Sequence, residues 1–440
     1  MLNGALSAVG STFELGKLAQ GIAGAAGILG GLVGALIGGR LSDRIGRRGV
    51  LLLVGPCLLF EAVLGAFSPA LGGYFFLLLC RIVGGIGFGA ATTVAPGYVA
   101  EIAPAHIRGR LIAFRQLAII LGLFFAGIIN VAVTRAAGSS TAVLEFGLEA
   151  WQWMFLCLLI PAVVFIVFTA RIPESPRWLV ARGRDEEAAA VLARVTGEED
   201  SAARVSTIRS SLGEDRDQLG ILAVLRSRWR GLVLIGVAVA AFQQFTGTNG
   251  IFFYSNTLFQ AVGFSEDSAL AQTLLLTAFK VVGVTAGILL VDRVGRRRML
   301  IWGGTLIFLS LAVEATVFTV APMVEGHPDI ASSPVLSVLA VAALCTFLLG
   351  FTSSWGPIFS IIMGEMFPNK IRGSAMSLAS GADFFVNFLV VLLFPFLVAW
   401  SPAGTYWIYF AFGVLAVAFT IRFLPETGNK QLEEMDEISR

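Results

Sequence analysis

The chain has 440 residues, of which 56% are hydrophobic and 14% are charged. A soluble globular protein carries roughly 25% charged residues, so these polar groups are too few to cover a surface in water, which excludes a soluble enzyme, a disordered chain and a coiled coil. The net charge of +2 gives no support to nucleic-acid binding, and the four cysteines lie in apolar runs, which predicts free thiols.

The predicted elements are long apolar helices. A membrane-spanning helix needs about 20 mostly apolar residues, and eleven segments meet that requirement. Residues 1–10 are apolar but too short to cross, and we expect them to be the end of a twelfth helix whose beginning is missing. The eleven segments are 18–38, 50–69, 75–100, 110–133, 151–171, 230–262, 269–291, 299–321, 336–363, 373–400 and 405–424.

Basic residues orient these helices. Arg and Lys gather in every second loop, as in 40–48 and 293–298, whereas the opposite loops hold only Lys17 and Arg135. The positive-inside rule places the basic side in the cytoplasm. We therefore expect a multi-pass protein of the cytoplasmic (plasma) membrane, embedded in the lipid bilayer, with a cytoplasmic C-terminus.

One long polar stretch, residues 172–229, separates two groups of helices. Ser175 can cap a short helix that starts at Pro176, and residues 184–195 suit a second helix. We predict a cytoplasmic helical linker, with a disordered spacer as the alternative. The predicted domains are an N-terminal bundle (1–171), the linker (172–229), a C-terminal bundle (230–424) and a short cytoplasmic tail (425–440).

Three motifs recur in the same order in both groups. They are GGRLSDRIGRR from residue 38 with GILLVDRVGRR from 287, EIAPAHIRG from 101 with EMFPNKIRG from 365, and PES from 173 with PET from 425. The predicted fold is therefore all-α, with two six-helix bundles related by an internal repeat and the first helix truncated. This is the parallel repeat of the major-facilitator fold, which works by rocking two halves about a central site.

The repeated loops predict a cytoplasmic latch. Their arginines can bind carboxylates at neighbouring helix ends, in bonds that form when the halves close on the cytoplasmic side and break when they open. Binding of these arginines to anionic lipid is the alternative. The predicted latch residues are Asp43, Arg47, Arg48, Glu101 and Arg108 in the first half and Asp292, Arg296, Arg297, Glu365 and Arg372 in the second.

Over almost its whole length the sequence resembles the sugar porter family of major-facilitator transporters. The matching motifs are RIVGGIGFG from Arg81, PGYVAEIAPAHIRG from Pro96, PESPRWL from Pro173, QQFTGTNGIFFYS from Gln243, PETG from Pro425 and the two D-R-x-G-R-R loops. PESPRWL and PETG also resemble organic ion transporters, so QQFTGTN is the discriminating element. The resemblance implies alternating-access transport of a sugar or polyol by a monomer, with no catalytic residues, cofactor or metal.

Three amides support a sugar site independently. Sugar hydroxyls want partners that both donate and accept hydrogen bonds, and Gln243, Gln244 and Asn249 supply amides within seven residues of one apolar helix. Gly247 and Gly250 can loosen that helix, so that the amides converge on one cavity. Polar contacts between helices are the alternative role for such amides.

The resemblance adds further site residues. Gln116 matches the family's fifth-helix sugar glutamine, and Gly356 begins the tenth-helix GPxxW motif, in which Ser360 replaces the Trp. Phe253 lies at the aromatic position after the seventh-helix Asn. Because several positions differ from the family pattern, we expect the pocket to prefer a substrate other than glucose, and a polyol, pentose, inositol or sugar acid stays open.

Two charges stand where the family more often has neutral amides. Lys280 replaces an Asn of the eighth helix, and Asp383-Phe384 replaces an Asn-Trp pair of the eleventh. A charge in a membrane is costly unless it faces a partner or water, so we hypothesise that Lys280 and Asp383 line the cavity and pair. These charges support an organic ion transporter as the alternative function. A non-transporting nutrient sensor is a third possibility, but such sensors usually have long cytoplasmic tails and residues 425–440 are too short for one.

Energy coupling rests on Arg81. Proton-coupled sugar porters pair this fourth-helix Arg with a first-helix Asp, whose position here falls before Met1. A buried Arg without an anion would be costly. Glu61 and Glu314 lie within apolar segments and are further candidates for coupling. Proton symport and facilitated diffusion both stay open.

Overall fold

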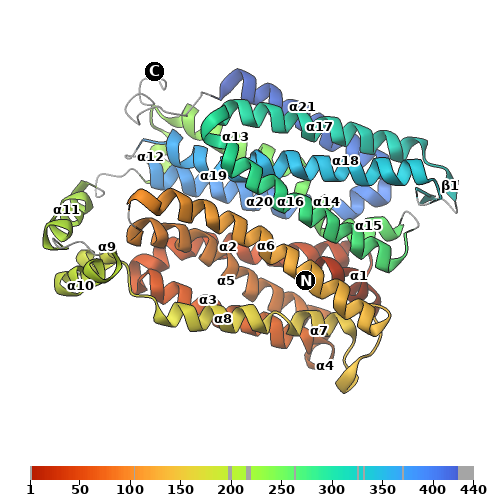
Figure 1. Cartoon of the computed structure of the whole chain (residues 1–440), viewed down its shortest axis with the longest axis horizontal. Coiled ribbons are helices and arrows are strands. Elements are labelled where there is room, and N and C mark those ends of the chain that lie inside the picture. Colours follow the sequence, from red (N-terminus) through yellow and green to blue (C-terminus); the bar gives the residue numbers. More distant parts are fainter. Residues whose placement is uncertain are drawn as a thin grey trace.

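The computed structural model is almost wholly helical (Figure 1). It describes residues 2–103, 105–196, 201–214, 220–261, 264–324, 327–330, 332–368 and 371–424. Within these residues eleven helical segments are long and apolar enough to cross a membrane. The eleven spans predicted from the sequence are therefore confirmed, and the short first helix packs beside them.

In the described part of the chain, the first bundle comprises eight helices. Its first helix, α1, has only 11 residues and contacts α2, α6 and α7. The helices are α1 (Leu2–Thr12), α2 (Lys17–Ile45), α3 (Arg47–Ala66), α4 (Ser68–Leu71), α5 (Gly73–Ile102), α6 (Ala105–Ala137), α7 (Ala150–Leu156) and α8 (Leu159–Arg171), with a 3₁₀ turn at Glu145–Gly147.

The second bundle follows the linker helices, which Figure 1 shows at one end of the molecule. Ser175 caps α9 by accepting a hydrogen bond from the Trp178 amide, as predicted. The linker helices are α9 (Pro176–Ala181), α10 (Asp185–Thr196), α11 (Ser201–Glu214) and α12 (Ile221–Leu225). The second bundle comprises α13 (Arg230–Phe245), α14 (Thr248–Phe253), α15 (Ser255–Ala261), α16 (Glu266–Val294), α17 (Arg296–Val320), α18 (Pro334–Ser353), α19 (Trp355–Met366), α20 (Arg372–Trp400) and α21 (Pro402–Phe423), with a small hairpin of β1 (Met323–Val324) and β2 (His327–Pro328).

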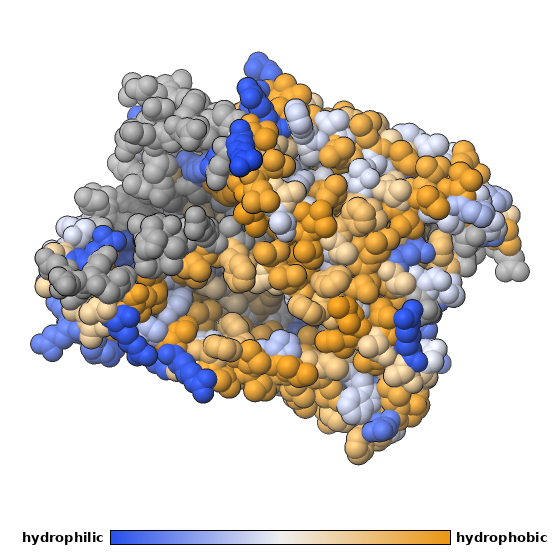
Figure 2. All heavy atoms as spheres, in the orientation of Figure 1, coloured by the Kyte–Doolittle hydropathy of each residue, from blue (hydrophilic) through white to orange (hydrophobic). Residues whose placement is uncertain are grey.

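The outer surface is apolar. Large side chains such as Phe75, Trp302 and Leu289 are mostly exposed, and Figure 2 shows hydrophobic residues across most of the visible face, with strongly hydrophilic ones toward its edges. An exposed apolar area of this extent is unfavourable in water. The surface suits hydrocarbon, where helices satisfy their own backbone hydrogen bonds.

Glycines explain the closest helix packing. In α2 and α5, a side chain on Gly30, Gly34, Gly85 or Gly89 would collide with a backbone carbonyl of the opposite helix. Small residues spaced four apart allow two helix backbones to approach closely in a membrane. The high glycine count of the sequence therefore has a structural cause at this contact.

The duplicated loops fold alike. Gly46 joins α2 to α3 and Gly295 joins α16 to α17, and both have a φ of +92°. Residues other than glycine rarely adopt this left-handed backbone conformation. The two D-R-x-G-R-R motifs therefore form the same tight turn, which supports the internal repeat.

The halves meet through α2 with α20 and through α6 with α16. Toward the end that carries the β1–β2 hairpin, the Tyr254 hydroxyl donates to the Gln20 carbonyl at 3.2 Å. At the same end the Ser140 amide donates to Glu266 at 3.2 Å. This end lies opposite the linker helices (Figure 1), and here the two halves are closed on each other.

Candidate substrate and coupling sites

A polar network lies between α13, α14 and α20. The Gln244 amide donates to Asp383 at 2.7 Å, and the Asn249 amide donates both to Gln244 and to Asn387 at 3.0 Å. Gln243 donates to the Trp355 carbonyl at 3.1 Å, and its own amide oxygen is buried without a hydrogen-bond partner in the described structure.

The backbone brings these amides together. α13 ends at Phe245 and α14 begins at Thr248, and Gly247 between them has a φ of +80°. This break lets Asn249 turn back toward Gln244, as the glycines in the sequence predicted. Gly250 has a different role, because a side chain there would press on the Phe394 ring.

Asn387 was missed by the sequence reasoning. It lies one helical turn after Asp383 on α20, so both side chains share a helix face. The four-residue spacing between Asp383 and Asn387 is the feature of the sequence that could have identified Asn387. The network offers both hydrogen-bond donors and acceptors, to which a neutral hydroxyl can bind. Its members are Gln244, Asn249, Asp383 and Asn387.

The hypothesis that Lys280 and Asp383 pair is wrong for this structure. Asp383 instead accepts from Gln244, while the Lys280 ammonium lies 3.6 Å from the centre of the Phe252 ring. Lys280 is only 5% exposed. An aromatic face attracts a cation, so the ring takes the place of the expected carboxylate.

The remaining predicted substrate residues lie around this network. Phe253 is half-buried beside Phe252, and Phe384 faces α2, where a side chain on Gly31 would meet its ring at 3.0 Å. Gly356 directly follows Trp355, which is fully buried and donates to the Leu300 carbonyl at 3.0 Å. The side chain of Gln116 lies outside the described residues.

The anion that Arg81 requires is Glu61. The Arg81 guanidinium on α5 forms an ion pair with the Glu61 carboxylate on α3, and both side chains are largely buried. Gly84 makes room for Glu61, because a side chain at that position would overlap the carboxylate. Gly27 of α2 likewise makes room for the guanidinium. A buried charge pair is tolerated in a membrane because the partners neutralise each other.

The predicted latch residues form two matching clusters. In the first, Arg47 binds Glu101 and Asp43, both at 3.1 Å; in the second, Arg296 binds Glu365 at 3.0 Å. Each of these three ion pairs joins residues of the same bundle, so they stabilise each half and do not by themselves join the halves. The side chains of Arg108, Asp292 and Arg372 lie outside the described part of the chain.

The neighbouring arginines also match. Arg48 donates to the Ala170 carbonyl at 2.8 Å, at the end of α8, and Arg297 donates to the Ile421 carbonyl at 2.5 Å, at the end of α21. A cation at a helix C-terminus satisfies free carbonyls and the helix dipole. The two turns are thus fastened to equivalent helix ends.

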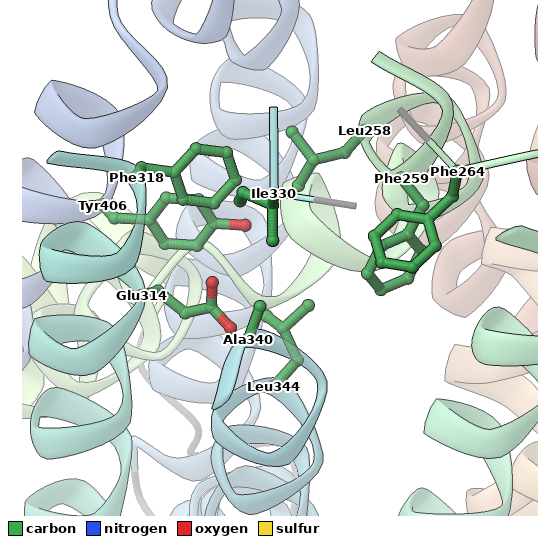
Figure 3. A pocket seen from close by; sticks show the side chains of 9 residues that line it. All are labelled: Leu258, Phe259, Phe264, Glu314, Phe318, Ile330, Ala340, Leu344 and Tyr406. Atoms are coloured by element: carbon green, nitrogen blue, oxygen red, sulfur yellow. The ribbon is translucent and has the colours of Figure 1, made fainter. Parts of the chain in front are cut away.

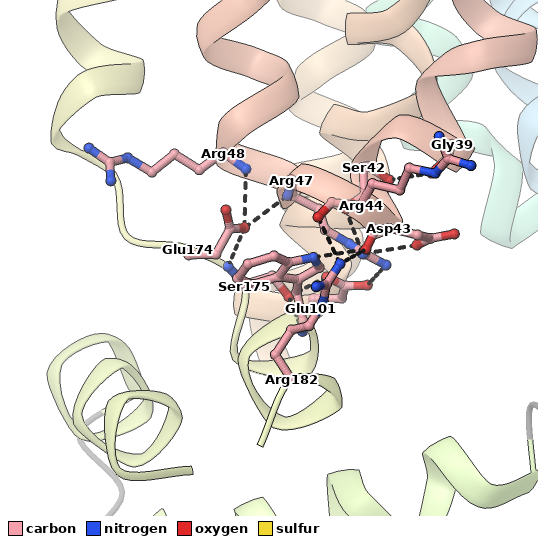
Figure 4. Close-up of polar contacts among 11 residues, drawn as sticks. Gly39, Ser42, Asp43, Arg44, Arg47, Arg48, Glu101, Glu174, Ser175 and Arg182 are labelled. Carbon is pink, nitrogen blue, oxygen red and sulfur yellow. Dashed lines mark hydrogen bonds and ion pairs between the residues drawn. The ribbon is translucent and has the colours of Figure 1, made fainter. Parts of the chain in front are cut away.

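Glu174 was not among the predicted latch residues. Its carboxylate accepts from the backbone amides of Arg47, Arg48 and Ser175 at 2.8–3.1 Å (Figure 4). The Ser175 hydroxyl in turn donates to Glu101. The free amides at the start of α3 are a natural anion site, and the PES motif therefore fastens the linker to the first bundle.

The duplicated bundles, the membrane-length helices and the buried polar network together define a transporter of the major-facilitator class. Residues 6–438 match the family described as "Sugar (and other) transporter", and the chain belongs to this sugar porter family. It is a multi-pass membrane transporter and not an enzyme, as predicted.

Relatives of the chain support this assignment over its full length. It is 36% identical to a glucose transport protein of Synechocystis sp., covering 99% of this chain and 92% of that protein. It is 34% identical to a D-xylose-proton symporter of Escherichia coli, covering 95% and 86%. The inward-open structure of the Escherichia coli xylose transporter XylE superimposes with a TM-score of 0.83 at 30% identity, covering 99% of this chain and 95% of that one.

Proposed function

We propose that this protein carries a neutral sugar or polyol across the plasma membrane together with a proton. The observation that carries the proposal is the network of Gln243, Gln244 and Asn249 with Asp383 and Asn387. Amides bind sugar hydroxyls in either direction, and the single carboxylate adds one strong acceptor. The names of its relatives, which include glucose transport and D-xylose-proton symport, support the same substrate class.

Alternating access follows from the two-bundle architecture. We propose that the halves 1–171 and 230–424 rock about this network, with the linker 172–229 and the tail 425–440 on the cytoplasmic side. The functional unit is a monomer, because each chain contains both halves and the complete network. The ion pair of Arg81 with Glu61 is the proposed coupling element in the first half.

The substrate test is uptake of a sugar panel into proteoliposomes, with and without an imposed pH gradient. We expect uptake of one or more pentoses, hexoses or polyols, with accumulation only when the outside is more acidic. The matched control is Gln272→Ala on α16, whose amide oxygen has no hydrogen-bond partner among the described residues. Weaker substrate affinity in Gln244→Ala but not in this control supports the site, and transport of none of the panel contradicts it.

A sugar acid is the second candidate substrate. Lys280 is buried and, within the described residues, forms no ion pair. A carboxylate on the substrate would supply the missing anion. Competition by a hexuronate against the neutral sugar, lost in Lys280→Met, would favour this candidate; weak competition that is unchanged in Lys280→Met would dismiss it.

A further inference from the structure

Glu314, on α17, is an acid that the proposed transport mechanism does not use. Its side chain is 1% exposed, and neither carboxylate oxygen has a hydrogen-bond partner among the described residues. It borders a small cavity about the size of one water molecule. Figure 3 shows the Glu314 carboxyl and the Tyr406 hydroxyl both directed into this space, which is otherwise enclosed by apolar side chains.

Among the described residues, the groups around Glu314 offer it no cation. The residues that line the cavity include Leu258 and Phe259 of α15, Leu344 of α18, Tyr406 of α21 and Ile330 of the preceding loop, and none of the lining residues is basic. The titratable groups that face Glu314 or lie next to the lining are Tyr406 and, one turn on, Tyr409 of α21, Cys345 of α18 and Asp329 beside Ile330.

The Tyr406 hydroxyl is likewise buried without a partner in the described structure. An isolated carboxylate in such surroundings is far more costly than a neutral carboxylic acid, and a group in this position takes up a proton instead. A single water in the cavity could bridge the acid to the Tyr406 hydroxyl.

The cover over this acid is also part of the closure between the halves. α15 contributes Leu258 and Phe259 to the cavity wall, and the same helix contacts α1 of the first bundle. Tyr254, at the break before α15, donates to the Gln20 carbonyl of α2. Movement of α15 away from α1 would therefore open both the contact between the halves and the wall over Glu314.

We propose that Glu314 is a proton-binding site whose protonation stabilises α15 in its closed position against α1. In the closed form the site holds a carboxylic acid. When α15 opens, water reaches the acid. The proton then transfers to water as hydronium, and the water that has entered hydrates the carboxylate. A proton bound here is separate from the ion pair of Glu61 and Arg81, so the proposal stands whether or not sugar transport is proton-coupled.

Hydrogen exchange of the amides in residues 254–261 tests this site. In the parent, after correction for the intrinsic pH dependence of exchange, the ratio of open to closed α15 should rise by up to about tenfold per pH unit over the range where Glu314 titrates. Glu314→Gln mimics the protonated acid, and we expect low exchange that no longer depends on pH. Asp329→Asn, a carboxylate outside the cavity wall, should retain the parental response.

The same pH response in Glu314→Gln as in the parent would overturn the proposal. Glu314→Met, which leaves an apolar side chain in the apolar site, is the second variant and should behave like Glu314→Gln. If both variants unfold, infrared spectra of the parent decide: a protonated carboxylic acid band should persist at neutral pH in parent protein, and its absence contradicts the proposal.

Discussion

Each half of the molecule buries an acid in the helix that follows its D-R-x-G-R-R turn, Glu61 in α3 and Glu314 in α17, and the two acids are neutralised differently. Glu61 follows Arg47 by 14 residues in α3, and Glu314 follows Arg296 by 18 residues in α17, one helical turn further on the same face. Glu61 has Arg81 as its partner. At the position that the repeat matches to Arg81, the second half has Cys345.

The comparison shows that duplication preserved the backbone and the turns but not the charge balance inside the bundles. Gly46 and Gly295 share a φ of +92°, and the ion pairs of Arg47 with Glu101 and of Arg296 with Glu365 have similar lengths of 3.1 and 3.0 Å. The interiors differ because a buried carboxylate needs either a cation or a proton. The first half has the cation, and we infer that the second takes the proton.

The largest effect should come from breaking the pair in the first half. Arg81→Met leaves Glu61 buried alone and should lower the free energy of unfolding by about 3–5 kcal/mol. Arg81→Met combined with Glu61→Leu should recover much of that loss. Unfolding of the purified protein in detergent measures both; a double variant as unstable as the sum of the singles would remove the pair as a stabilising unit.

Substitution of Gly84 tests how tightly the ion pair of Glu61 and Arg81 is packed. Gly84→Ala places a methyl group where the Glu61 carboxylate lies, and overpacking of this kind costs about 1–3 kcal/mol. Gly122→Ala on α6 is the control, since a side chain there meets nothing. Thermal unfolding should separate the two variants, and equal midpoints would show that Glu61 moves aside without loss.

The polar network of Gln244, Asn249, Asp383 and Asn387, which we propose binds the sugar, lies in the second half. Gln244→Ala removes a hydrogen bond to Asp383 and the acceptor for Asn249. A lost hydrogen bond of about 0.5–1.5 kcal/mol corresponds to substrate binding weaker by about 2- to 12-fold. Uptake kinetics measure it; unchanged affinity in both Gln243→Ala and Gln244→Ala would exclude the network from the site.

The smallest effect is the coupling between Lys280 and Asp383. Because Lys280 lies on Phe252 and Asp383 accepts from Gln244, the effects of Lys280→Met and Asp383→Asn on transport should add to within about 0.5 kcal/mol. A strong interaction in the double-variant cycle would show that the two charges pair in another conformation of the transport cycle.

The sequence was enough to predict much of the fold. Hydrophobic length identified the eleven spans, the repeated motifs identified two bundles, and the glycine run after Gln244 predicted the break at Gly247. These features are local in sequence or repeated along it. The second break, at Tyr254, has no glycine or proline to indicate it and depends on packing around α15.

The contacts between helices could not be predicted in the same way. Gln243, Gln244 and Asn249 were identified because they are adjacent in sequence, whereas Asn387 and the Lys280–Phe252 contact depend on which faces of separate helices meet. The sequence could have identified Glu61 as the partner of Arg81, because a buried Arg needs an anion and few acids lie in the apolar segments. The state dependence of the latch stays a prediction.

The central claim is that sugar and proton move together through this protein. The most direct measurement is the pH inside proteoliposomes that contain a trapped pH-sensitive dye, after sugar is added outside with no gradient imposed. We predict that the lumen acidifies as sugar enters, and that Arg81→Met abolishes the acidification. Sugar entry with no change in internal pH would contradict coupling and leave the protein a facilitator.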